Sequence, residues 1–131
     1  MSKIVDIINK LPGLLPLKPA TDIDVKDAEI QLRVNFNEEY KDYLLAFGAI
    51  IADGIELTGI AKSAHRNVVA QTKQELGLNS KVPNTMYVIE NTGVDGIIIW
   101  QDTAGAIYQS SPNIEPKKIA GSLSAYLNSR I

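Results

Sequence analysis

The sequence predicts an α+β fold: one domain, residues 1–131, with a largely antiparallel β-sheet meander packed against N-terminal and C-terminal helices. Apolar side chains recur at helical spacing before residue 48, and short β-branched runs separated by turn residues fill much of the second half. Helical spacing returns near the C-terminus. A length of 131 residues suits one domain of roughly 100 to 200 residues. With 45% hydrophobic residues, the core needs no disulfide or structural metal.

The first helix is predicted over residues 4–11. Its isoleucines and its leucine lie at i, i+3, i+4 and i+7, which places them on one helical face, and Pro12-Gly13 ends the segment. Residues 14–20 include Pro16 and Pro19, which restrict the backbone and lack hydrogen-bond donors. This segment is therefore predicted to be an extended connection that buries at least one of its leucines.

Two further helices are predicted before residue 48. The side chains of residues 21–24 offer acceptors for the free amides of a helix start, and that helix should end near Asn35. Asn37 can cap a third helix, in which the apolar side chains of residues 40–47 again share one face. Gly48 is a suitable residue to end it.

Strands are expected from residue 49. Residues 49–52 and 55–58 are short β-branched runs on either side of Asp53-Gly54, a strong tight-turn dipeptide, and they predict a hairpin. A fourth helix is then predicted, capped by Ser63 and ended by Gly77. Because this helix is mostly polar, we expect it to be peripheral.

The remaining strands are predicted to form a meander closed by a helix. Residues 86–90, 97–101 and 106–110 are rich in Ile, Val, Tyr or Trp and are joined by turns that contain Gly and Asp. One face of such an antiparallel sheet can stay exposed. Apolar residues between positions 119 and 127 lie at i, i+4, i+7 and i+8 and predict the last helix, and Lys117-Lys118 before it is interpreted as a solvated turn.

Composition removes several classes of function. The chain has no cysteine, which excludes thiolate catalysis, disulfides and thiolate-bound metals. Its formal net charge is −2 and its basic residues are scattered, so direct nucleic-acid binding is not expected. No stretch is long enough to span a bilayer, and the N-terminus lacks the pattern of a secretory signal. We therefore expect a cytoplasmic protein that binds no membrane.

No residue pattern predicts catalysis, a metal or a cofactor. His65 is the only histidine and lacks a nucleophile motif, so its expected role is that of a surface or helix-start residue. Asp22, Asp24 and Asp27 alternate like oxygen ligands, but the glycine and bidentate glutamate of an EF-hand are missing, and helix capping explains them. The sequence therefore predicts a binding protein and no enzyme.

Acidic and aromatic side chains gather in or beside the predicted strands and turns. Negative charge around an exposed aromatic sheet suits the binding of a basic protein, whereas the alternative for each aromatic side chain is an ordinary core position. The candidate partner-binding residues are Asp53, Glu56, Glu90, Asp95, Trp100, Asp102 and Tyr108.

Several segments together resemble the SUKH superfamily in residue pattern and in order. They are Ala28-Glu29 with Leu32, residues 37–44, Phe47-Gly48, and residues 54–60, 87–96 and 105–108. The resemblance spans roughly residues 21 to 110. The chain resembles a divergent member, because Phe36-Asn37 stands where the family often has Leu-Pro and Phe47-Gly48 where it often has Asn-Gly.

The resemblance implies a SUKH-like fold and a binding function. The superfamily includes fungal cell-wall-assembly regulators and small bacterial immunity proteins, which neutralise secreted toxins of polymorphic and contact-dependent inhibition systems. A chain of 131 residues resembles the bacterial immunity type. The implied partner is a cognate toxin domain, with a basic nuclease as the expected class. It would be bound 1:1 and occluded by a protein that is a monomer when free.

Two other functions stay open from the sequence. A cytoplasmic regulatory scaffold of the fungal type would join other proteins without inhibiting any of them. A small enzyme that uses Asp or Glu side chains could share the fold, because one fold hosts unrelated functions. A pocket with convergent carboxylates would indicate the enzyme.

Overall fold

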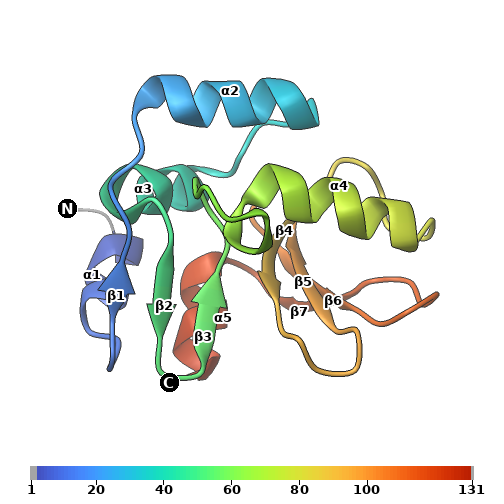
Figure 1. Ribbon diagram of the computed structural model, residues 1–131. Coiled ribbons are helices and arrows are strands. Elements are labelled where there is room, and N and C mark those ends of the chain that lie inside the picture. The colour runs from blue at the N-terminus through green and yellow to red at the C-terminus, as the bar shows by residue number, and fades with distance from the viewer. Residues whose placement is uncertain (1–2, 131) are drawn as a thin grey trace.

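A computed structural model describes residues 3–130 of the chain (Figure 1). The predicted α+β fold is confirmed, with helices and two antiparallel sheets. The elements are, in chain order, α1 (Lys3–Asn9), β1 (Leu15–Pro16), α2 (Asp22–Leu32), α3 (Glu38–Phe47), β2 (Ile50–Ala52), β3 (Ile55–Leu57), the 3-10 helix η1 (Ala64–Arg66), α4 (Val68–Leu78), β4 (Tyr87–Asn91), β5 (Ile98–Gln101), β6 (Ile107–Ser110), β7 (Lys117–Ala120) and α5 (Leu123–Arg130).

Helices α2 and α3 begin at the side-chain caps that the sequence predicts. Thr21 Oγ1 accepts a hydrogen bond from Asp24 N at 3.1 Å, and Asp24 Oδ2 accepts one from Thr21 N at 3.0 Å, which makes a capping box. Asn37 caps α3 by accepting from Glu39 N at 3.1 Å. Both predicted helix starts are therefore confirmed.

Gly48 ends α3 and allows two chain segments to approach closely. Its φ is +72°, and a Cβ atom there would lie 2.1 Å from the carbonyl oxygen of Lys18. Only glycine fits this position, because any side chain would collide with backbone. Leu17 N then donates to Ala49 O at 2.8 Å, and the segment 14–20, predicted as extended, contains β1, an edge strand of the three-stranded sheet. Leu14 is the leucine of that segment that packs against the core.

The strands form a three-stranded sheet in the order β1-β2-β3 and a four-stranded sheet in the order β4-β5-β6-β7. All pairings between these strands are antiparallel. Thr58 joins the two sheets, because its N donates to Ile89 O at 2.9 Å and its Oγ1 donates to Val88 O at 2.8 Å. The predicted Asp53-Gly54 turn connects β2 to β3, and the three predicted meander strands are β4, β5 and β6.

Apolar clusters cover both faces of the four-stranded sheet at β4 and β5. Tyr87, Ile89 and Ile99 belong to the main core, which also contains buried residues of α1, α3 and α5. Val88 and Trp100 belong to a second cluster. That cluster consists of Val82, Met86, Val88, Ile98 and Trp100, with Leu76 of α4 packed against it.

Helix α4 overturns the prediction of an exposed sheet face and of a peripheral fourth helix. It lies against β4 (Figure 1) and buries Val68, Gln71, Thr72 and Glu75. Thr72 Oγ1 accepts from Val88 N at 2.9 Å, so a polar residue of this helix makes a structural contact with the sheet. The helix is polar in composition but is needed to cover the second apolar cluster.

Three predicted boundaries are wrong for local reasons. Asn67, and not Ser63, caps α4, and a short 3-10 turn lies before it. Gly77 lies inside α4, which runs on to Leu78. Lys117 and Lys118 belong to the edge strand β7 and not to a turn, because residues 117–120 pair with β6.

Candidate functional site

The candidate residues of the sequence do not form one surface. Asp53 and Asp95 are exposed, while Glu56, Asp102 and Tyr108 are half-buried. Glu90 and Trp100 are buried, with 3% and 0% of their surfaces exposed. The expectation that these last two side chains face solvent is wrong, and each belongs to the interior for a different reason.

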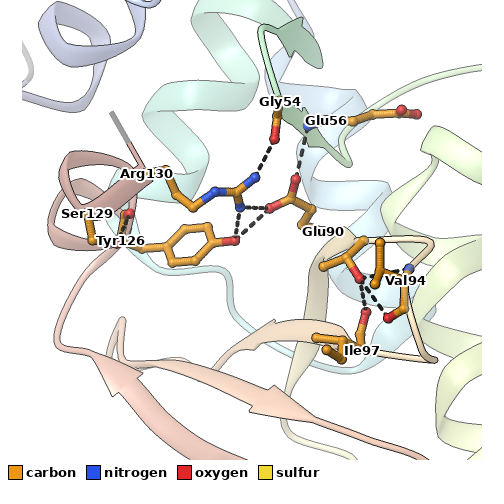
Figure 2. A network of polar contacts seen from close by, with 9 residues as sticks. Gly54, Glu56, Glu90, Val94, Ile97, Tyr126, Ser129 and Arg130 are labelled. Atoms are coloured by element: carbon orange, nitrogen blue, oxygen red, sulfur yellow. Dashed lines mark hydrogen bonds and ion pairs between the residues drawn. The ribbon is translucent and has the colours of Figure 1, made fainter.

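Glu90 is the centre of a buried polar network between α5 and the sheets (Figure 2). Its Oε1 accepts from Tyr126 Oη and from Arg130 Nη1, each at 2.6 Å, and its Oε2 accepts from Glu56 N at 3.1 Å. Arg130 also donates to the carbonyl oxygen of Gly54. Burial, followed by the charge and hydrogen bond of Glu90, raises the pKa of Tyr126. Glu90 therefore attaches the C-terminal helix to β3 and β4.

Trp100 is buried because α4 and the segment before β4 cover its face of the sheet. Its indole Nε1 donates to Ser110 Oγ at 2.8 Å. It pairs with Val88 on β4 and with Tyr108 on β6. The alternative of an ordinary core position holds for this aromatic residue.

Asp102 and Tyr108 interact with each other at the β5–β6 turn. Tyr108 Oη donates to Asp102 Oδ2 at 2.9 Å, and Ala106 N donates to Asp102 Oδ1 at 3.0 Å. The hydrogen bond to Asp102 raises the pKa of Tyr108. Both side chains remain half-exposed, so a partner could contact them without unfolding the turn.

Asp53 and Asp95 are the acidic candidates most open to a partner. Asp53 lies in the β2–β3 turn and Asp95 in the β4–β5 turn, where its φ is +53°. Among residues 3–130, neither carboxylate takes part in an ion pair. Glu56 lies near Asp53 on β3 and is 3.5 Å from His65 Nε2. Arg130 also donates to Gly54 O in the β2–β3 turn, but its ion-pair partner is Glu90 and not Asp53.

A small pocket that the sequence did not indicate lies between the end of α4 and the four-stranded sheet. We call it the Trp100 pocket. It has a volume of about 260 Å³, and its lining includes Glu75, Leu78, Ile98, Trp100, Ser110 and Pro112. Glu75 lies four residues after Gln71 and three after Thr72, both buried, so helical spacing could have placed it on the inner face of α4.

The described part of the chain contains no cluster of metal-ligating side chains, and its histidine lies at the surface. No group of three or more His, Asp or Glu side chains within residues 3–130 could hold a metal ion. His65 is exposed on η1, as expected, and its ion-pair partner among residues 3–130 is the Glu56 carboxylate. Over the same residues, no helix combines the length and apolarity needed to cross a bilayer.

The fold and these surfaces define a small α+β protein with several partner-accessible acidic turns and a covered sheet. The profile of the SUKH_5 family, described as SMI1-KNR4 cell-wall, matches residues 1–131. The chain therefore belongs to the SUKH family. Proteins of this family are of toxin-immunity or cell-wall-related kinds and are generally not enzymes.

A solved structure supports the fold. The crystal structure of a protein from Pseudomonas syringae pv. tomato superposes with a TM-score of 0.71 at 16% sequence identity, over 98% of this chain and 96% of that one. At this identity the likeness concerns the fold alone. A comparison with curated proteins gives no match.

Proposed function

We propose that this chain is an immunity protein that binds a cognate secreted toxin domain and neutralises it by occlusion in a 1:1 complex. The family match over residues 1–131 is the observation that carries the proposal, because toxin immunity is one of the known roles of the family. The predicted toxin is a basic nuclease of a polymorphic or contact-dependent inhibition system. A cytoplasmic location and a monomeric free state remain predictions.

The charge of the exposed turns supports this partner. Nuclease domains bind phosphates and tend to be basic, and negative turns would speed their association by electrostatic steering. A standard interface covers roughly 800 Å² on each partner. The chain has 6854 Å² of accessible surface, so such an interface would cover about an eighth of it. Asp53 and Asp95 are the proposed charged contacts within it, with Glu56, Asp102 and Tyr108 as half-buried candidates.

Complex formation tests the proposal. Tagged protein is mixed with the toxin domain encoded directly upstream, and the complex is isolated and weighed by light scattering. We expect a 1:1 complex and survival of cells that express both proteins. Absence of a complex together with death of those cells would overturn the immunity function.

A regulatory scaffold is the second candidate, and the cell-wall description of the matching family favours it. A scaffold would bind its partners without changing their activity. The same purified protein therefore distinguishes the two functions: an immunity protein abolishes toxin activity, whereas a scaffold forms complexes in which the partner stays active.

A further inference from the structure

The Trp100 pocket holds a carboxylate in largely apolar surroundings. Glu75 is 9% exposed, and its Oε2 accepts a hydrogen bond from Gln74 Nε2 at 3.0 Å. Within residues 3–130, no hydrogen bond reaches its Oε1 and no cation pairs with the side chain. The only fully buried side-chain atoms without a partner in that part of the chain belong to Arg66. Glu75 Oε1 is therefore not fully buried, and Glu75 is one of the residues that line the pocket.

A carboxylate in this position favours a cationic ligand. Removing a charge from water is costly unless an opposite charge or hydrogen-bond donors compensate for it. The single neutral donor from Gln74 compensates only in part. A positively charged group that entered the pocket would meet a carboxylate that is mostly shielded from water, where the attraction is stronger than at a fully exposed ion pair.

The other walls favour an aliphatic stem next to that charge. Leu78, Ile98, Trp100 and Pro112 contribute to the lining, and Leu78 is 68% exposed at the surface. Lysine and arginine bury their methylene stems on apolar surfaces while the cationic head stays with a polar partner. The cationic head would therefore lie near the Glu75 carboxylate, and the methylene stem would pack on the apolar lining.

The volume of the pocket limits the occupant to about one side chain. Its roughly 260 Å³ is smaller than the usual 300 to 1,000 Å³ of sites for drug-sized ligands. Gly96 of the β4–β5 turn also contributes to the lining. A Cβ atom at Gly96 would lie 2.7 Å from Pro112 Cγ, so this turn contacts the β6–β7 loop beside the pocket.

We propose that the Trp100 pocket binds one lysine or arginine side chain of the partner protein, with Glu75 as its counter-ion. This deepens the proposed function, and rests on it for the identity of the partner. A basic side chain inserted into a small, partly enclosed pocket has the properties of an interface hot spot, where a few anchors dominate the binding energy. The pocket thus gives the negative surface a defined point of attachment for a basic partner.

NMR titration of the full chain with single-residue probes tests the proposal without the toxin. The probes are Nα-acetyl-lysine methylamide and its arginine equivalent, and the norleucine equivalent serves as a probe with a similar stem and no charge. Trp100 is the only tryptophan, so its indole N–H gives one assignable side-chain signal. We expect this signal to shift saturably with the basic amides and much less with the norleucine amide.

The variant Glu75→Gln supplies the matched test of the charge. It preserves the side-chain shape and removes a buried charge, so the fold should persist, and affinity for the basic probes should fall about tenfold. Glu38→Gln on α3, outside the pocket, changes net charge equally and should leave that affinity unchanged. If neither basic probe shifts the indole signal, if norleucine binds equally well, or if Glu75→Gln binds like the unmodified chain, the proposal is wrong.

The outcome separates this inference from the immunity function. If the chain neutralises its toxin but binds no basic probe, the immunity proposal stands and the pocket proposal is wrong. If the chain binds the probes through Glu75 but forms no complex with the toxin, the pocket does bind basic side chains and the immunity proposal is wrong.

Discussion

Single residues divide into those that hold the fold together and those that are free to bind. Glu90 belongs to the first group, because its carboxylate accepts from Tyr126, Arg130 and the backbone of Glu56. The residue type alone does not reveal this. An acidic residue in a strand has the same sequence signature whether it faces solvent or accepts hydrogen bonds from a distant helix.

The variant Glu90→Gln should lower the free energy of unfolding by about 2 kcal/mol, because Arg130 loses its counter-charge and the network loses its strongest acceptor. Chemical denaturation measures this. Glu56→Gln is the control, since its ion pair with His65 is exposed and should contribute less than about 1 kcal/mol. Equal losses in the two variants would contradict the structural role of Glu90.

Asp53 and Asp95 belong to the second group, and their charge can be removed without disturbing the backbone. Asparagine is favoured before glycine in tight turns and tolerates positive φ, as position 95 requires. The double variant Asp53→Asn with Asp95→Asn should therefore keep its stability and associate with the toxin several-fold more slowly at low salt. Stopped-flow mixing at two salt concentrations measures the rate.

The control for this variant is Asp27→Asn, which removes charge from the middle of α2, away from both turns. Its association rate should match that of the unmodified chain. If the double variant associates at an unchanged rate, the two turns are not part of the toxin-binding surface.

Among the elements, α2 depends on a capping box whose strength varies with pH. Hydrogen bonds from the backbone and side chain of Thr21 lower the pKa of Asp24 below its usual 3.8. A carboxyl whose pKa is lower in the folded state stabilises the fold above its unfolded pKa, and this contribution is lost as the pH falls through the folded value.

Asp24→Asn keeps an acceptor at the cap but removes the charge. The variant should be less stable than the unmodified chain at neutral pH, and the gap should narrow as the pH falls below about 4. Thr21→Ala, which removes the other half of the box, should cost about 1 kcal/mol. Thermal unfolding across the acid range tests both predictions. A stability difference between Asp24→Asn and the unmodified chain that stays constant as the pH falls would contradict the role of the charged cap.

Elements governed by local signals could be predicted from the sequence. The capped starts of α2 and α3, the Asp53-Gly54 turn and the three central meander strands depend on neighbours in the chain. Strand β7 could not be found this way. Ile119 matched the spacing of the last helix, yet residues 117–120 pair with β6 and leave its side chain 45% exposed. Long-range pairing overrides local periodicity there.

The candidate site was less predictable than the elements, for the same physical reason. Whether Trp100 and Glu90 face solvent depends on where α4 and α5 pack against the sheets. That long-range packing cannot be inferred from the local sequence pattern. Exposed turn residues such as Asp53 and Asp95 could be placed, because tight turns lie on the surface. The Trp100 pocket combines α4, β5 and the β6–β7 loop, so it exists only in the folded chain.

In the whole molecule, aromatic packing joins the helical layer to the sheets. Phe36, Tyr40 and Tyr87 have ring centroids 4.8 to 5.1 Å apart, and Tyr43 lies 5.5 Å from Tyr40. Burial raises the pKa of Tyr40, Tyr43 and Tyr87 above the usual 10.0. The folded chain therefore retains protons that the unfolded chain would release in alkali.

This linkage predicts an alkaline transition. The stabilising contribution is complete below about pH 10 and is lost as the pH rises above it, so unfolding and ionisation of the buried tyrosines should coincide. Circular dichroism and tyrosinate absorbance, recorded together, measure the two processes. Tyr108→Phe, at a half-buried position, should leave the transition in place. Ionisation of all tyrosines while the fold persists would contradict the packing described.

The central claim is that this SUKH-family chain neutralises a toxin by binding it 1:1 and occluding it. The measurement that tests this most directly is a titration of the cognate toxin's activity with purified protein, at a toxin concentration well above the dissociation constant. The proposal predicts a linear loss of activity that reaches zero at one molar equivalent. Full toxin activity in the presence of excess protein would contradict it.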